Sequence, residues 1–198
     1  MPFLTPGIVL RPSNPTLHAA SRTLFEERGV LVAEWAARLS DRAAGTHNVP
    51  PELMKRHLRL MVDLVAEMAG PLRRESRELW EKACQHYGRT AAARGLVAGE
   101  VADEFSALRE ILTRDLAASV SALRSRQALA VLLHLNRVID RGIAVAVAGY
   151  TDALVAELYV QDGVPSAGNG LEPADVEKQL GALERELVAV TTPPTGGM

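Results

Sequence analysis

Aromatic residues are scarce in this chain, at 4% of the sequence, and Cys84 is the single cysteine. One cysteine cannot form a disulfide within the chain, which is the usual condition of proteins in a reducing cytoplasm. Alternating β-branched and polar residues are also uncommon, whereas alanine and leucine are abundant. Because alanine and leucine favour helices, this composition predicts an all-α protein.

The chain has neither a strong charge of one sign nor a long hydrophobic run. Its formal net charge of -2 gives no broad attraction for the phosphates of nucleic acid. Its most apolar segment, 142–150, lies between Arg141 and Asp152 and is far shorter than the ~20 residues that a bilayer requires. The first residues do not resemble a secretory signal. We therefore expect a cytoplasmic protein with no nucleic-acid partner and no membrane span.

Apolar residues recur at helical spacing over residues 14–162, and each run ends at glycine, proline or a polar loop. This pattern predicts a bundle of about five helices, which follows an N-terminal extension at residues 1–13. The expected helices cover residues 15–42, 51–69, 72–93, 99–123 and 126–161. The hydrophobic content of 47% is sufficient for a substantial core.

The composition changes after Asp162, where residues 163–171 are rich in glycine and form a predicted linker. Residues 172–190 then alternate apolar spacings of four and three, which predicts an amphipathic helix, and residues 191–198 form a tail. Two heptads are marginal for an isolated coiled coil, so we expect this helix to dock on a bundle surface, of its own chain or of a partner. The candidate contact residues are Val176, Leu180, Leu183 and Leu187.

The stretch from His86 to Leu112 combines an apolar helical pattern with many charges and is interrupted by Gly95 and Gly99. If its two helices are antiparallel, charges from both meet across the turn, and a buried charge must be paired or hydrogen-bonded. Two interpretations remain open: a structural tie between Glu104 and one arginine, or a polar pocket for a ligand or partner. The candidate residues for either are His86, Arg89, Arg94, Glu104 and Arg109.

The expected helix 126–161 is apolar on nearly every side in its middle, which is typical of a central helix or a subunit interface. Small residues there permit close approach of another backbone, and they include Ala144 and Ala148. They fit a dimer seam and a tight bundle core equally well. The candidate interface residues in this helix are Gly142, Ala146 and Gly149.

The sequence contains no phosphate-binding glycine loop after a strand, no Gly-x-Ser-x-Gly elbow and no Cys-x-x-Cys pair. Its histidines are scattered and lack the Glu-x-x-His spacing of di-iron bundles. His47 and His57 are expected to be solvated, while His86 and His134 are the better candidates for a haem-axial role. A lone helical histidine is more often structural, so we predict no enzymatic activity, no cofactor and no metal.

Two patches resemble a known family. The first consists of His86-Tyr87-Gly88, Arg94-Gly95, Glu104-Phe105 and Leu108-Arg109; the second runs from Leu135-Asn136-Arg137 through Ile139-Asp140 to Tyr150. Together they are similar to the N-terminal domain of RsbRD-type proteins, the RsbT co-antagonists of bacterial stress signalling, over about Leu31 to Leu158. The resemblance implies an all-helical, non-catalytic input domain that forms a homodimer through its helices, usually ahead of a STAS or histidine-kinase output domain.

The residues after Tyr159 are too few for either output domain. Either the chain acts through a separate protein partner, or it is one domain of a larger protein. We expect a non-enzymatic sensory or protein-interaction module in bacterial signal transduction, of the stress-response or two-component type, that acts through a separate protein partner. Two alternatives stay open. One is a small-molecule or haem-binding helical sensor whose charged patch around His86 and Arg109 lines a pocket; the other is a structural adaptor.

Overall fold

The computed structural model describes residues 15–42, 49–161 and 173–192, and over these ranges it is a packed helical bundle without strands. The predicted all-α class is therefore confirmed. The expected linker, N-terminal extension and most of the tail lie outside the described residues. The helices are α1 (Pro15–Arg42), α2 (Pro51–Ala69), α3 (Ser76–Ala93), α4 (Ala98–Asp115), α5 (Ala117–Ser121), α6 (Ser125–Gln161) and α7 (Pro173–Thr191).

Two helix boundaries differ from those expected. Residues 72–75 form a turn, so α3 begins at Ser76. The helix expected at 99–123 is divided at Leu116, whose ψ of -5° ends α4 and leads into the short α5. The break keeps both Leu116 and Val120 buried, and α5 packs against α6. Burial of these two side chains explains the break between α4 and α5, since the sequence has no glycine or proline there.

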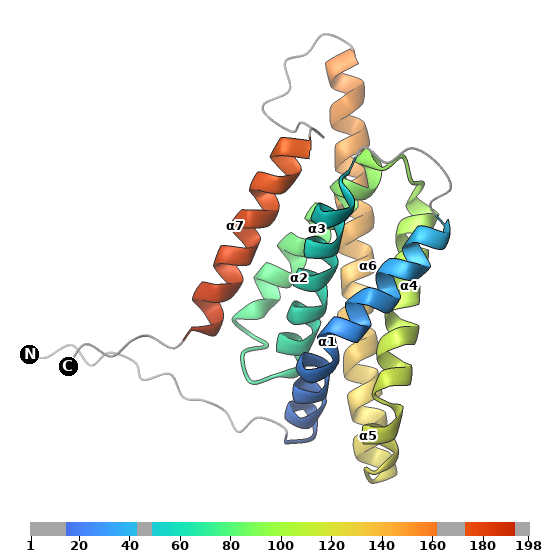
Figure 1. Cartoon of the computed structure of the whole chain (residues 1–198), viewed down its shortest axis with the longest axis vertical. Helices are drawn as coiled ribbons and strands as arrows, with labels where there is room; N and C mark the ends of the chain where they lie inside the picture. The colour runs from blue at the N-terminus through green and yellow to red at the C-terminus, as the bar shows by residue number, and fades with distance from the viewer. Residues whose placement is uncertain (1–14, 43–48, 162–172, 193–198) are drawn as a thin grey trace, which may run out of the picture.

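Helix α6 is the central element of the bundle, and it packs most extensively against α3 and α4 and less extensively against α1, α2 and α5 (Figure 1). α1 crosses α2 and α4 on one side, whereas α7 lies against α3 on the other. Four of the aromatic residues are buried together in the core. Phe105 is edge-on to three other buried rings, those of Trp35, Trp80 and Tyr87.

The backbones of α3 and α6 are in direct contact where the two helices cross. A Cβ atom added to Gly88 would lie 1.8 Å from the Ala146 carbonyl oxygen, and one added to Gly149 would lie 2.3 Å from the Gln85 carbonyl oxygen. A Cβ on Gly142 would lie 2.6 Å from the Trp80 ring. Only residues without a side chain permit this approach.

The three candidate interface residues of α6 therefore contact another helix of the same chain. Gly142, Ala146 and Gly149 are buried against α3, which is the bundle-core alternative left open by the sequence. Ala144 and Ala148 are exposed on the opposite side of the helix. In this middle part of α6, these two alanines are the exposed small residues that a second copy could approach.

Helix α7 docks on its own bundle against α2 and α3. The candidate contact residues Val176, Leu180 and Leu183 are buried, and Leu187 is half-buried against the core. Three ion pairs border this apolar stripe: Arg56 with Glu177 at 3.3 Å, Arg56 with Glu184 at 2.6 Å, and Lys82 with Glu186 at 2.9 Å. None of the helices that the structure describes has the length and hydropathy of a membrane span.

Candidate functional site

The corner between α3 and α4 is built by two capping arrangements. Gly95 follows α3 with φ of 75°, a left-handed conformation that glycine adopts without strain. The Leu96 amide donates to the Ala91 carbonyl and the Gly95 amide to that of Ala92, which is the Schellman pattern of a helix end. At the start of α4, the Glu100 carboxylate accepts a hydrogen bond of 2.8 Å from the Val97 amide. These caps place the end of α3 beside the first turns of α4.

A buried ion pair occupies the inside of this corner. Arg94 donates from its two terminal nitrogens to the Glu104 carboxylate, at 3.0 and 2.5 Å, and both side chains are less than one-tenth exposed. The Tyr87 hydroxyl donates to the same carboxylate at 2.7 Å. The Trp35 indole donates to the Glu104 backbone carbonyl at 2.9 Å, which attaches α1 to the corner.

The charge on Glu104 favours the protonated forms of both Arg94 and Tyr87. Burial opposes the charge of Arg94, but the hydrogen bonds and charge of Glu104 outweigh it and leave the pKa of the guanidinium raised. Burial raises the pKa of the Tyr87 phenol well above its usual range, and the Glu104 charge raises it further. The phenol therefore stays protonated and remains a donor. The arrangement has the paired form that a buried charge requires.

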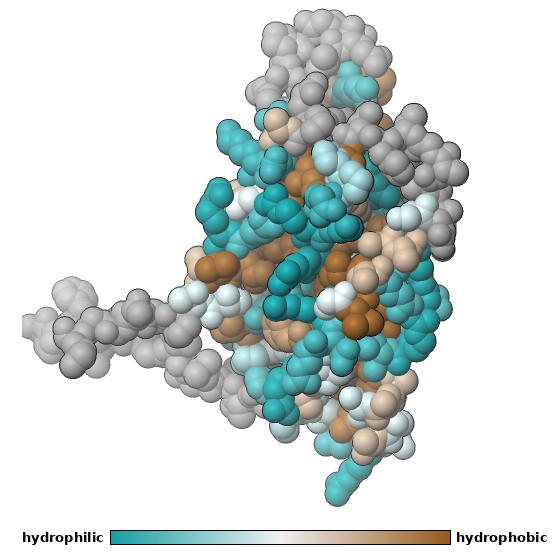
Figure 2. Space-filling view, in the orientation of Figure 1, coloured by the Kyte–Doolittle hydropathy of each residue, from teal (hydrophilic) through white to brown (hydrophobic). Residues whose placement is uncertain are grey.

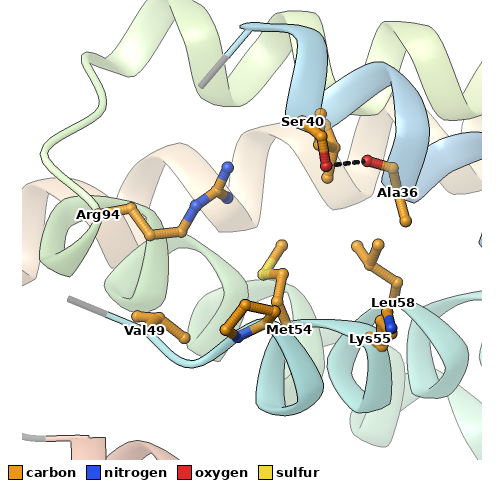
Figure 3. Close-up of a pocket in the computed structure, with 9 residues that line it drawn as sticks. Ala36, Ser40, Val49, Met54, Lys55, Leu58 and Arg94 are labelled. Carbon is orange, nitrogen blue, oxygen red and sulfur yellow. Dashed lines mark hydrogen bonds between the residues drawn. The ribbon is translucent and has the colours of Figure 1, made fainter. Parts of the chain in front are cut away.

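A cavity of about 130 Å³ adjoins the ion pair between the end of α1 and the start of α2. Apolar side chains provide most of its lining, and Figure 3 shows Arg94 extending from α3 into the space between Ser40 and Met54. Lys55 stands at its exposed rim. The sequence patterns did not single out this cavity, because its walls come from four separate segments: Ala36, Leu39, Ser40; Val49; Pro51, Met54, Lys55, Leu58; and Arg94.

A second polar feature lies beneath α7, where the rings of His57 and His86 stack with centroids 4.9 Å apart. The expectation that His57 is solvated is wrong, since only 1% of it is exposed. The helical phase of α2 explains the error: Leu53, His57 and Leu60 share the buried face, while the neighbouring Lys55 lies outside it. Because His57 follows two charged residues in the sequence, its position on the buried face of α2 was not predicted.

Neither histidine is in an environment that favours a positive charge. Burial lowers the pKa of His86 to about 4, and the neighbouring Arg89 also disfavours its protonation. Burial lowers the pKa of His57 well below its usual range, and the charges of His86 and Arg94 act in the same direction. Gln179 of α7 faces His86, and Lys82 and Glu186 line the same groove between α3 and α7. Both rings are therefore neutral near pH 7.

This pair predicts that acid destabilises the protein. Because the folded-state pKa of His86 is about 4 and its ordinary value is 6.5, the unfolded chain binds protons more readily between those values. We expect the free energy of unfolding to fall by about 2 kcal/mol as pH falls from 7 to 4.5. Urea titrations across this range measure it.

The His86→Gln variant is the control for this prediction, because burial also raises the pKa values of the Asp63 and Glu67 carboxyl groups. Their protonation in the folded state opposes the loss of stability in acid. Comparison with the variant isolates the imidazole, and we expect a flatter pH dependence. Equal slopes for the two proteins would contradict a buried, neutral His86.

The remaining candidate residues are not brought to one place. Arg109 forms an ion pair with Asp140 across α4 and α6, away from the cavity, and Arg89 lines the groove beneath α7 beside His86. His134 makes a hydrogen bond of 2.8 Å between its Nε2 and the Met68 carbonyl. In the described ranges, no three potential metal ligands gather together. The five candidate residues thus divide between the corner, the α7 groove and the surface.

The last turns of α6 carry a feature that the sequence patterns did not single out. α6 extends past the ends of the neighbouring helices (Figure 1), and Leu154, Val155, Leu158 and Tyr159 are 38% to 61% exposed there. By contrast, on the face shown in Figure 2 the apolar residues in the middle are bordered by hydrophilic side chains. The sequence does contain a pattern that indicates this surface: Leu154 and Val155 lie one helical turn before Leu158 and Tyr159, so all four share one side of the helix.

The family model for the RsbT co-antagonist protein rsbRD N-terminal domain matches residues 29–162, well over half of the chain. The match contains the Arg94–Glu104 corner and leaves α7 outside. No curated protein and no solved structure shows a significant match. Domains of this family are sensory, not catalytic, and are associated with stress-response regulatory signalling. The predicted resemblance is confirmed, and the chain belongs to the family of RsbT co-antagonist protein rsbRD N-terminal domains.

Proposed function

We propose that this chain is a non-enzymatic sensory and protein-interaction module in bacterial signalling, of the stress-response or two-component type, and that it acts as a homodimer on a separate protein partner. Family membership supports the signalling role. The observation that carries the interaction role is the exposed apolar end of α6, defined by Leu154, Val155, Leu158 and Tyr159.

Scattered exposed apolar side chains are ordinary in monomers, whereas a contiguous patch indicates an interaction surface. The four residues of the α6 end occupy adjacent turns on one side of the helix. Helical spacing places the exposed Ala144 and Ala148 on that same side. Small residues followed by an apolar end give a second helix a surface to approach closely. A second copy of α6 presents the matching surface, as a two-fold interface requires.

The substitution Leu158→Asp tests this surface. Leu158 is 61% exposed, so the change leaves the bundle intact, but it places a charge in the proposed contact. We expect the natural chain to be a dimer at high micromolar concentration and the variant to be a monomer. Sedimentation equilibrium measures both.

The matched control is Val188→Asp, because Val188 is 62% exposed on α7 and lies outside the proposed surface. This variant should remain dimeric. A natural chain that is monomeric, or a Leu158→Asp variant that dimerises like the control, would contradict the proposed role of the α6 end.

A further inference from the structure

The cavity between α1 and α2 has the size and lining of a small-molecule site. Its volume of about 130 Å³ is close to that of the engineered cavity of ~150 Å³ that binds benzene. Leu39, Met54 and Leu58 provide apolar walls from two helices. Arg94 is the one buried charged side chain among the lining residues. A mostly apolar cavity with a few positioned polar groups is the usual form of a ligand site.

The Arg94 guanidinium offers hydrogen-bond donors to the cavity. An arginine side chain carries five N–H groups, and the two hydrogen bonds to Glu104 use one from each terminal nitrogen. The group therefore keeps further donors, and its side chain extends into the cavity (Figure 3). A ligand that enters beside it needs an oxygen that can accept.

The charges around the cavity favour an uncharged ligand. Glu104 already neutralises Arg94, and Lys55 at the rim is paired with Glu52 at 2.9 Å. A ligand anion beside Arg94 would also lie near the Glu104 carboxylate, and its desolvation would have no uncompensated positive charge to offset it. A carbonyl or hydroxyl oxygen avoids both costs and still accepts from Arg94.

We infer that this cavity binds a small uncharged molecule with an apolar body of about six heavy atoms and one carbonyl or hydroxyl oxygen that accepts a hydrogen bond from Arg94. The apolar body lies against Met54, Leu58 and Leu39. This site is separate from the α6 end, so either proposal stands or fails without the other.

Three probes of similar shape test the inference on the full chain: cyclohexanone, methylcyclohexane and cyclohexanecarboxylate. With methionine methyl groups labelled, binding is followed at Met54, which lines the cavity, while the fully buried Met61 serves as internal reference. We expect cyclohexanone to shift the Met54 resonance saturably. Methylcyclohexane lacks the oxygen and cyclohexanecarboxylate carries a charge, so both should bind at least about tenfold more weakly.

A pair of variants locates the site. Ala36→Leu extends a side chain into the cavity from α1, whereas Ala37→Leu makes the same change at the next residue, which faces solvent. Cyclohexanone should bind the first variant at least about tenfold more weakly and the second like the natural chain. Absence of saturable binding, equal affinity for all three probes, stronger binding of the carboxylate, or undiminished binding to Ala36→Leu would each overturn the inference.

Discussion

The Gly88→Ala variant is expected to lose about 3 kcal/mol or more of unfolding free energy, because the added methyl group has no space. Its Cβ would lie 1.8 Å from the Ala146 carbonyl oxygen and 2.8 Å from the Tyr150 amide nitrogen. Both are backbone atoms of α6, so no flexible side chain can move aside. To admit the methyl group, α3 and α6 must separate along the contact on which the core is built.

The matched control is Gly29→Ala in α1, where an added Cβ meets no atom within 4 Å. Here alanine restricts the unfolded chain and favours the helix, so we expect a gain of about 0.5–1 kcal/mol. Urea unfolding followed by far-ultraviolet circular dichroism measures both variants. If Gly88→Ala were as stable as the natural chain, α3 and α6 would not approach each other as closely as described.

The Glu104→Gln variant has the second large expected effect, a loss of about 3–5 kcal/mol. Glutamine keeps the shape of glutamate and an oxygen for the Tyr87 hydroxyl, but it removes the charge that compensates Arg94. The Arg94 side chain is only 6% exposed, so its charge would remain buried without a partner. Unfolding in urea, followed by the fluorescence of the buried Trp35 and Trp80, measures this loss.

A double variant separates charge from packing at this pair. Arg94→Met alone leaves the Glu104 carboxylate buried and should also be strongly destabilised. Glu104→Gln combined with Arg94→Met leaves no buried charge, so we expect it to regain most of the stability. If the double variant lost the sum of the stabilities that the two single variants lose, Arg94 and Glu104 would not be energetically coupled. Asp140→Asn is the surface control: it breaks a partly exposed pair with Arg109 and should cost less than about 1 kcal/mol.

Much of the architecture could be predicted from the sequence, because local residue patterns determine where helices begin and end. Pro51 and Gly70 mark the limits of α2, and the apolar spacing of Val176, Leu180 and Leu183 predicts the face on which α7 docks. The family could also be predicted, since its two patches are read directly from the chain. The break at Leu116 could not, because burial against α6 produced it without a local signal.

The candidate site could be predicted only in outline. The sequence indicated that a charge near the α3–α4 turn needs a partner, but Arg89, Arg94 and Arg109 were equal candidates. Helical phase and the capped corner selected Arg94 by turning it inward towards Glu104. The same phase buried His57, although its charged neighbours predicted a solvated side chain.

The sequence by itself therefore determined the helical class, the family and the need for a partner to any charge buried at the α3–α4 corner. Only the tertiary structure decided that Gly88 contacts α6, that Trp35 bonds to Glu104 and that Met54 faces a cavity beside Arg94. The physical reason is the distance along the chain over which each kind of interaction acts. Propensity and periodicity act between residues a few positions apart, whereas these contacts join distant helices and depend on how the helices cross and rotate when the core packs.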